Sequence, residues 1–264
     1  MAALGSQDVG SIVKLNVDGT AWNWIVVHQG LPGSMYDTSC DGTWLLMQDI
    51  YEERGWDSNN NDYANSDIHS YQSNTFVNLF DSDIKSVIKQ VKIPYTKGTG
   101  QNGSLATGSN GLSATVFQLS YTEVGLSGGK ANREGHVLSY FEGAENSKRV
   151  AMFNGSRTMW GLRSPSTNTA SSGYAWCVET YGSADAYRVR DPHGLRPALV
   201  LPSELSVESD GSVTLASGAI TGSVNIGGVQ RELTGKGYIN IGGVLRELSD
   251  SNVNIGGILK SLKG

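Results

Sequence analysis

The sequence lacks a long hydrophobic run and an excess of basic residues. No apolar stretch approaches the roughly 20 residues needed to span a bilayer, so we expect no membrane insertion. The 264 residues include 20 lysines and arginines against 25 acidic residues, a net charge of −5. Such a chain offers no basic surface to neutralise phosphates, so nucleic acid is not an expected partner. The first eight residues have neither a basic region nor an apolar core, so we expect no signal peptide and folding in a bacterial cytoplasm.

Cysteine and histidine are also scarce. Cys40 and Cys177 lie too far apart in the sequence for a CxxC metal or redox motif. They could pair as a disulfide, but two reduced, buried thiols are the favoured interpretation for a cytoplasmic chain. The four histidines have no metal-ligand spacing such as HxxxH, so neither a metal nor a cofactor is predicted.

Glycine is plentiful, and the apolar pattern changes along the chain. Residues 10–27 alternate apolar and polar residues around Asp18-Gly19, which predicts a β-hairpin. Ser66 can cap a helix over 68–80, and a second helix is predicted over 83–90. Further strands are predicted within 43–48, 114–120, 136–141, 159–163, 174–179, 187–190 and 197–201.

The C-terminal part of the chain carries a repeat. Residues 206–223 are rich in Ser, Gly, Ala and Asp, which predicts a linker after a domain at 1–205. The segment 224–233 then recurs at 239–248 and 253–262, each copy with Gly-Gly between β-branched residues. Residues 224–264 are therefore predicted to form three β-hairpins, with Ile226 beside Val229 and Val224 beside Arg231.

Motifs for catalysis or metal binding are weak. Residues 98–103 satisfy GxGxxG and 125–129 satisfy GxSxG, but neither lies between a strand and a helix. Residues 57–62 place oxygen ligands at alternate positions, which leaves a weak Ca²⁺ site as the alternative to a polar turn. Glu52 and Glu53 are adjacent, so in a strand they would point to opposite faces and make a poor acid and base pair.

The segment 174–193 has a different composition. It gathers Tyr, Trp, Arg, Asp and Glu among small residues. Tyr and Arg are typical of binding hot spots because each joins a large contact area to a polar tip. The alternative is an ordinary sheet with polar residues facing solvent, and composition alone does not choose between the two.

Several segments taken together resemble a C-type-lectin-like family of Firmicute prophage tail proteins. They are 30–46, 61–71, 80–95, 160–165 and 194–203, and the resemblance covers about residues 8 to 205. It implies an α+β fold with two helices, a twisted antiparallel sheet and long loops. The 224–264 repeats also resemble the C-terminal ends of phage tail proteins.

Members of this family resemble the variable proteins of diversity-generating retroelements, in which a C-terminal stretch of the lectin-like fold is rewritten. The resemblance implies that the corresponding stretch here contacts the ligand and lines one exposed face. Its candidate ligand-binding residues are Glu179, Tyr181, Ser183, Asp185, Tyr187, Arg188, Arg190, Asp191 and His193.

From this resemblance we expect a receptor-binding protein of a virion tail tip or fibre, not an enzyme. Its expected partners are a host-surface protein or glycan, other tail proteins and further copies of itself, with a trimer favoured by analogy with tail fibres. One alternative is a structural baseplate or tail-cap protein without receptor binding. Another is a hydrolase of surface glycan, for which the poorly placed Glu52 and Glu53 are the only raw material. Formylglycine-generating enzymes share the lectin-like fold but use a pair of nearby reactive cysteines, which Cys40 and Cys177 do not supply in sequence, so that enzymatic branch is disfavoured.

Overall fold

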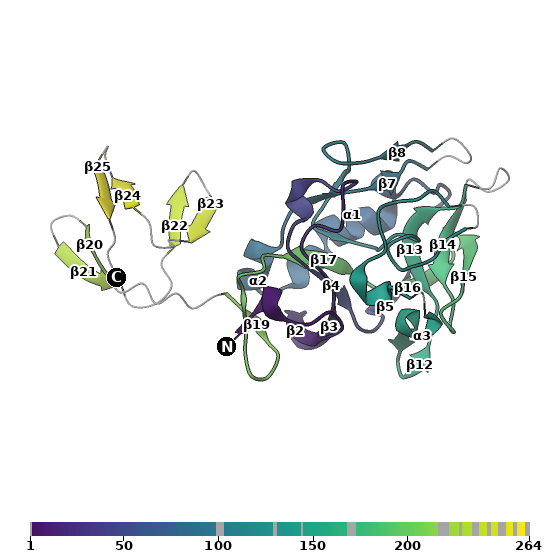
Figure 1. The fold of residues 1–264 in the computed structure, drawn as a ribbon, viewed down its shortest axis with the longest axis horizontal. Helices are drawn as coiled ribbons and strands as arrows, with labels where there is room; N and C mark the ends of the chain where they lie inside the picture. The colour runs from purple at the N-terminus through teal and green to yellow at the C-terminus, as the bar shows by residue number, and fades with distance from the viewer. Residues whose placement is uncertain are drawn as a thin grey trace. The chain divides into compact units, whose positions relative to one another are not determined.

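The computed structural model describes residues 2–98, 103–128, 131–143, 145–167 and 173–215, together with the backbone of strands between 222 and 261. The chain divides into two compact units, Met1–Thr214 and Leu215–Gly264. The first unit combines sheets, short helices and long loops, which confirms the predicted α+β class (Figure 1). Among the described residues, no helix combines the length and the apolar character that a bilayer crossing requires.

The first unit is built on two five-stranded sheets instead of the single twisted sheet that was expected. One has the strand order β10-β17-β4-β3-β2. Its β2–β3 hairpin turns at Asp18 and Gly19, whose positive φ angles of 51° and 70° suit a two-residue turn. The strands are β2 (Ile12–Val17), β3 (Thr20–Gln29), β4 (Thr43–Met47), β10 (Val116–Phe117) and β17 (Ala198–Leu201).

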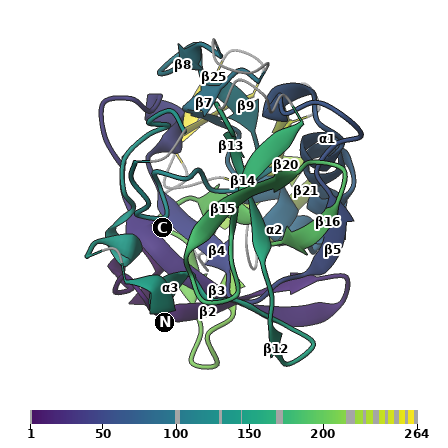
Figure 2. The same ribbon diagram turned by 90° about the vertical axis from the view of Figure 1, so that its right-hand side faces the viewer.

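The second sheet has the order β15-β14-β13-β16-β5. Its pairs are antiparallel except that β13 and β16 are parallel. β14 and β15 form a hairpin that lies toward the viewer in Figure 2. The strands are β5 (Glu52–Gly55), β13 (Trp160–Pro165), β14 (Tyr174–Val178), β15 (Ala184–Arg188) and β16 (Pro192–Leu195).

The helices are shorter than the sequence pattern predicts. α1 (Asp67–Asn74) begins as expected, with the Ser66 hydroxyl accepting the His69 N–H at 3.2 Å. α2 (Ser82–Val87) ends early because the Lys89 N–H donates to the Val200 carbonyl of β17 instead of continuing the helix. The other helical segments are η4 (Phe76–Leu79), which follows α1, and α3 (Asn146–Arg149), η1 (Leu4–Ser6), η2 (Thr38–Cys40), η3 (Tyr63–Asn65) and η6 (Ser139–Phe141).

The remaining strands of the first unit make two- and three-stranded sheets. These are β1 (Ala2–Ala3) with β18 (Ser206–Val207) and β19 (Val213–Thr214); β6 (Val91–Ile93) with β9 (Leu112–Ala114); β7 (Tyr95–Thr96) with β8 (Leu105–Ala106); and β11 (Met152–Phe153) with β12 (Ser156–Arg157).

One predicted strand is wrong. Residues 136–141 have strand composition, but they run as coil into the 3-10 turn η6. Their backbone N–H groups donate to separate partners in the core and not to a neighbouring strand. The His136 N–H donates to the Tyr36 hydroxyl at 3.2 Å, and the Leu138 N–H donates to the Glu123 carbonyl at 3.0 Å. A segment held in this way cannot form a ladder.

The predicted domain boundary also moves. The linker was expected over 206–223, but residues 206–214 form β18 and β19, which extend the sheet begun by β1. Val207 and Val213 are buried. These two apolar side chains hold the segment although Ser, Asp and Gly dominate its composition, and the first unit ends at Thr214.

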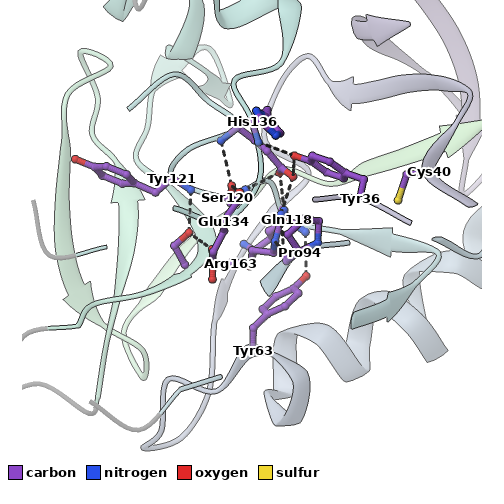
Figure 3. A network of polar contacts seen from close by, with 12 residues as sticks. Tyr36, Cys40, Tyr63, Pro94, Gln118, Ser120, Tyr121, Glu134, His136 and Arg163 are labelled. Carbon is purple, nitrogen blue, oxygen red and sulfur yellow. Dashed lines mark hydrogen bonds and ion pairs between the residues drawn. The ribbon is translucent and has the colours of Figure 1, made fainter. Parts of the chain in front are cut away.

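A network of buried polar groups crosses the middle of the first unit (Figure 3). Arg163 of β13 donates to both carboxylate oxygens of Glu123 at 2.6 Å, and both side chains are fully buried. The Tyr36 hydroxyl donates to the same carboxylate at 2.8 Å. Paired carboxylate oxygens satisfy the guanidinium fork, which a buried charge requires.

A second carboxylate, Glu134, lies beside this pair. It accepts from the Thr96 N–H at 2.5 Å and from the Ser164 hydroxyl. Burial raises the pKa of Glu134, although Arg163 opposes the shift. Glu123 and Glu134 therefore join the segment 118–136 to Arg163 and Ser164 of the second sheet.

The second unit consists of hairpins, as predicted. Ile226 is opposite Val229 and Val224 is opposite Arg231, the register inferred from the sequence. The Gly-Gly pairs themselves lie outside the described residues. The three pairs are β20 (Gly222–Ile226) with β21 (Val229–Leu233), β22 (Tyr238–Ile241) with β23 (Val244–Glu247), and β24 (Asn252–Ile255) with β25 (Ile258–Ser261).

Candidate functional site

The β14–β15 hairpin carries the segment that the sequence singled out. β14 is buried from Ala175 to Val178, and β15 forms the edge of its sheet. Trp176 and Val178 belong to the main hydrophobic core, where the Trp176 ring lies 4.6 Å from the Tyr121 ring. One face of the hairpin is thus anchored in the core, so the connecting loop is presented on a packed support.

The loop between the two strands is held from both sides. The Glu179 N–H donates to the Ser183 carbonyl at 2.8 Å, and the Gly182 N–H donates to the Glu179 carbonyl at 2.9 Å. From outside the loop, Arg149 Nε donates to the Gly182 carbonyl at 2.7 Å. At its tip, Tyr181 is 69% exposed, with the Arg157 guanidinium 5.4 Å from the ring centre.

Behind the tip, Glu179 organises a polar cluster. Its carboxylate accepts from the Ser183 hydroxyl at 2.6 Å and from the Tyr187 hydroxyl at 2.9 Å. These bonds lower the pKa of Glu179, and the carboxylate raises the pKa of Tyr187 to about 12. The Tyr187 ring lies 5.5 Å from the His193 ring, which brings β16 into the cluster. Burial lowers the pKa of His193, so its imidazole is neutral at pH 7.

A second cluster surrounds a depression of about 350 Å³ at the far end of β15. Arg188 Nε donates to the Tyr174 hydroxyl at 3.2 Å. Arg190 lies on the same rim, with its Nε 3.9 Å from Asp191. The lining residues are Ser58, Asn59, Gly173, Tyr174, Arg188, Val189 and Arg190.

The sequence analysis expected the nine candidate residues to line one exposed face. The structure instead divides them between the two faces of β15 and its flanking loops. Successive side chains of a strand point to opposite faces, so Tyr187 and Arg188 belong to different sides of β15. Asp185 is two residues from Tyr187 and therefore shares its face of β15, where it lies opposite Cys177 of β14. Tyr181, Ser183, Asp185, Arg188, Arg190 and Asp191 are exposed, whereas Glu179, Tyr187 and His193 are partly buried.

The sequence did not indicate the contribution of residues 58 and 59. They line the depression because Asp57, at the start of the loop, shapes it: its Oδ1 accepts the N–H groups of Asn59 and Asn60 at 2.9 Å each. The Asp57-Ser58-Asn59 pattern was the available signal, because Asp often bonds backbone two residues ahead in a turn. No sequence pattern pointed to Arg157 as part of the site, because only the tertiary fold brings it to Tyr181.

The structure also places the other motifs that the sequence offered for catalysis or metal binding. Glu52 pairs with Arg54 at 2.8 Å, while Glu53 is exposed. Ser127 of the GxSxG match lies in an exposed loop, and the GxGxxG match lies partly outside the described residues. Within the described part of the chain, no group of three or more His, Cys, Asp or Glu is arranged to hold a metal ion. Cys40 and Cys177 are buried and unpaired, which confirms the prediction of two free thiols.

Comparison with known proteins places the chain in a family but gives no activity. No curated protein and no solved structure matches it. A family described as "Domain of unknown function (DUF6273)" matches residues 41–203, which is more than half of the sequence. This range contains the whole second sheet and strands β4, β10 and β17 of the first, whereas β2 and β3 precede it. It also contains the two clusters just described. The chain belongs to the DUF6273 family.

Proposed function

We propose that this chain is a phage or prophage virion protein whose first unit binds a host-surface ligand through the β14–β15 hairpin and the adjoining β16. The observation that carries the proposal is Tyr181, a large aromatic side chain left 69% exposed at the tip of a loop that is otherwise fixed by hydrogen bonds. Exposed Arg157 of β12 lies beside the Tyr181 ring, and exposed Arg188 and Arg190 lie at the other end of β15. Rigid aromatic and Arg side chains are the usual anchors of protein recognition.

We further propose that the first unit is a C-type-lectin-like domain. The mixed architecture, two principal helices and long loops over packed sheets support this fold. The buried network of Arg163, Glu123 and Glu134 also fits a domain with a variable binding surface. Because the network fixes the loop-rich interior, surface residues can vary without loss of the scaffold.

Binding without catalysis fits the environment of the two thiols. Burial raises the pKa of Cys40 to about 12, and burial also raises the pKa of Cys177. The thiolate is the reactive form, so both cysteines are protonated and unreactive near pH 7. This favours recognition over the cysteine-dependent chemistry of formylglycine-generating enzymes.

The second unit is proposed to be the assembly segment. Each hairpin pairs within itself, and among the described strands none pairs with another hairpin. An isolated two-stranded hairpin is at best marginally stable in water. We infer that the hairpins are stabilised by further copies of the chain, most simply a trimer, or by other tail proteins. Several copies would raise the avidity of the first unit for a surface.

The test is surface binding by purified, labelled protein to a panel of gut Firmicute cells. Tyr181→Ala and Arg190→Ala should each weaken binding about tenfold or more, because hot-spot side chains cost roughly 2 kcal/mol when truncated. Tyr187→Ala should weaken it similarly, and Tyr187→Phe should separate the ring from its hydrogen bond to Glu179.

Arg133→Gln is the matched control, since Arg133 is exposed but lies outside the second sheet. Thermal midpoints should stay nearly unchanged for Tyr181→Ala, Arg190→Ala and Arg133→Gln. If the variants at 181, 187 and 190 bind cells as well as the unmodified protein does, the hairpin is scaffold and the baseplate alternative is favoured.

A further inference from the structure

The depression beside β15 has the size and lining of a small-molecule site. Its volume of about 350 Å³ is within the range of ligand pockets, and it has room for a monosaccharide. Hydroxyl and amide groups from Ser58, Asn59 and Tyr174 surround it, and Arg188 and Arg190 supply positive charge. Among the described residues, those that line the depression include no Asp or Glu.

The orientation of Arg188 leaves its guanidinium available. Its Nε donates to the hydroxyl of Tyr174, its partner across the β14–β15 hairpin, at 3.2 Å. Arg188 forms no ion pair with any residue that the structure describes. The two terminal nitrogens can therefore donate in parallel to two oxygens of one anionic group, the geometry that guanidinium groups favour.

One carboxylate, Asp191, partly offsets the positive charge of the site. Its Oδ1 forms an ion pair with Arg190 Nε at 3.9 Å, which is too long for a hydrogen bond and is screened by water because both side chains are more than half exposed. Asp57 lies beneath the loop, and its Oδ1 is occupied by the N–H groups of Asn59 and Asn60 and by the Asn60 amide. A pocket lined by two cations is thus present on a chain with a net charge of −5.

We propose that this pocket binds an anionic saccharide, a sugar unit that carries a carboxylate or phosphate group. The charged group contacts the terminal nitrogens of Arg188 and the guanidinium of Arg190. The sugar hydroxyls contact Tyr174, Ser58 and Asn59. The inference rests on the proposed function, because it names the ligand class that the same surface would recognise on a host cell.

Binding of small probes to the full chain tests the proposal, measured by ligand-observed NMR. Methyl glucuronide represents a sugar carboxylate, glucose 6-phosphate a sugar phosphate, and methyl glucoside is the neutral control. At least one anionic probe should bind at least tenfold more tightly than the glucoside, and the bound probe identifies which anion is preferred. Its affinity should fall as salt rises, because salt screens exposed charges. Equal binding of all three probes, or binding of none, would overturn the proposal.

Variants assign the binding to the pocket. Arg188→Gln and Arg190→Gln should each reduce binding of the anionic probe at least tenfold. Arg188→Lys, which keeps the charge but loses the fork, should reduce it less. Arg133→Gln removes an exposed arginine elsewhere and should leave the affinity unchanged. If Arg188→Gln retains its thermal midpoint and still binds the probe normally, the pocket is not the anion site.

The cell-binding assay separates this inference from the proposed function. If Tyr181→Ala abolishes surface binding while Arg188→Gln does not, the receptor-binding role stands and the anionic-saccharide inference fails. Loss of surface binding in both variants, with competition by the anionic probe, supports the two together. If neither variant affects surface binding, both proposals fail.

Discussion

Gly182 fixes the shape of the β14–β15 loop for a backbone reason. Its φ is +83°, and a Cβ atom placed there would lie 2.0 Å from the Asn146 carbonyl oxygen. Gly155, in the β11–β12 turn, has a similar φ of +78° but nothing within 4 Å of that position. Both glycines have a positive φ, but only Gly182 also lies so close to another backbone segment that a side chain would clash with it.

Gly182→Ala should therefore destabilise the first unit more than Gly155→Ala. A non-glycine residue in a left-handed conformation costs of order 1–3 kcal/mol, and the clash with Asn146 adds to that cost at residue 182 alone. Denaturant unfolding of both variants gives the comparison. Equal losses would mean that the Asn146 contact relaxes freely and that α3 does not constrain the loop.

His69 makes stability depend on pH. Its ring lies 5.0 Å from the Tyr63 ring, its Nδ1 has no hydrogen-bond partner among the described residues, and burial lowers its pKa. A histidine with a lowered folded-state pKa contributes stability above the unfolded value of about 6.5. That stability is lost as the pH falls through the folded pKa. His28 and His193 are shifted in the same direction by burial.

The thermal midpoint should therefore fall as the pH is lowered from 7 to 5. His69→Phe keeps the ring packing and removes the titration, so its midpoint should fall less over the same interval. Glu134 acts in the opposite direction, because its raised pKa favours the folded state at low pH. An unchanged pH slope in His69→Phe would show that His28 and His193 account for the effect.

At the scale of elements, β14 shows how one strand serves two purposes. Trp176 is 9% exposed and belongs to the main core, while the loop that β14 enters carries the exposed Tyr181. Trp176→Ala should cost about 3–5 kcal/mol in the free energy of unfolding, the usual range for removing a buried aromatic ring. Tyr181→Ala should change it by less than about 0.5 kcal/mol, as at an exposed position.

Calorimetry or urea unfolding separates these two expectations, with Trp176→Phe as an intermediate case. Should Tyr181→Ala prove as destabilising as Trp176→Ala, the loop tip would be part of the scaffold. Its exposure would then no longer argue for binding.

At the scale of the whole molecule, the two units have different requirements for stability. The first unit contains both five-stranded sheets and the buried core, whereas each hairpin of the second pairs only within itself among the described strands. Deleting residues 219–264 should leave the thermal midpoint of the first unit within a few degrees and reduce the oligomeric state to a monomer. Light scattering measures the second effect. A truncated protein that keeps the full-length mass would locate assembly in the first unit.

The sequence by itself determined the local elements. The β2–β3 turn follows from Asp18-Gly19, the start of α1 from Ser66, the central strands from runs of apolar residues, and the hairpin register of the second unit from Gly-Gly. These features depend on residues close together in the chain, whose backbone preferences and side-chain periods act locally. The sequence also identified Tyr181, Arg188 and Arg190 as surface candidates.

Only the tertiary structure decided how these elements combine. Residues 136–141 have strand composition, yet Tyr36 and Glu123 accept their N–H groups, and both partners are distant in sequence. The same holds for the Arg163–Glu123–Glu134 network and for the division of the candidate residues between two faces of β15. The depression by Arg188 exists because Asp57 folds a loop against a strand more than a hundred residues away. Long-range packing and the satisfaction of buried polar groups selected these contacts, and no local pattern encodes either requirement.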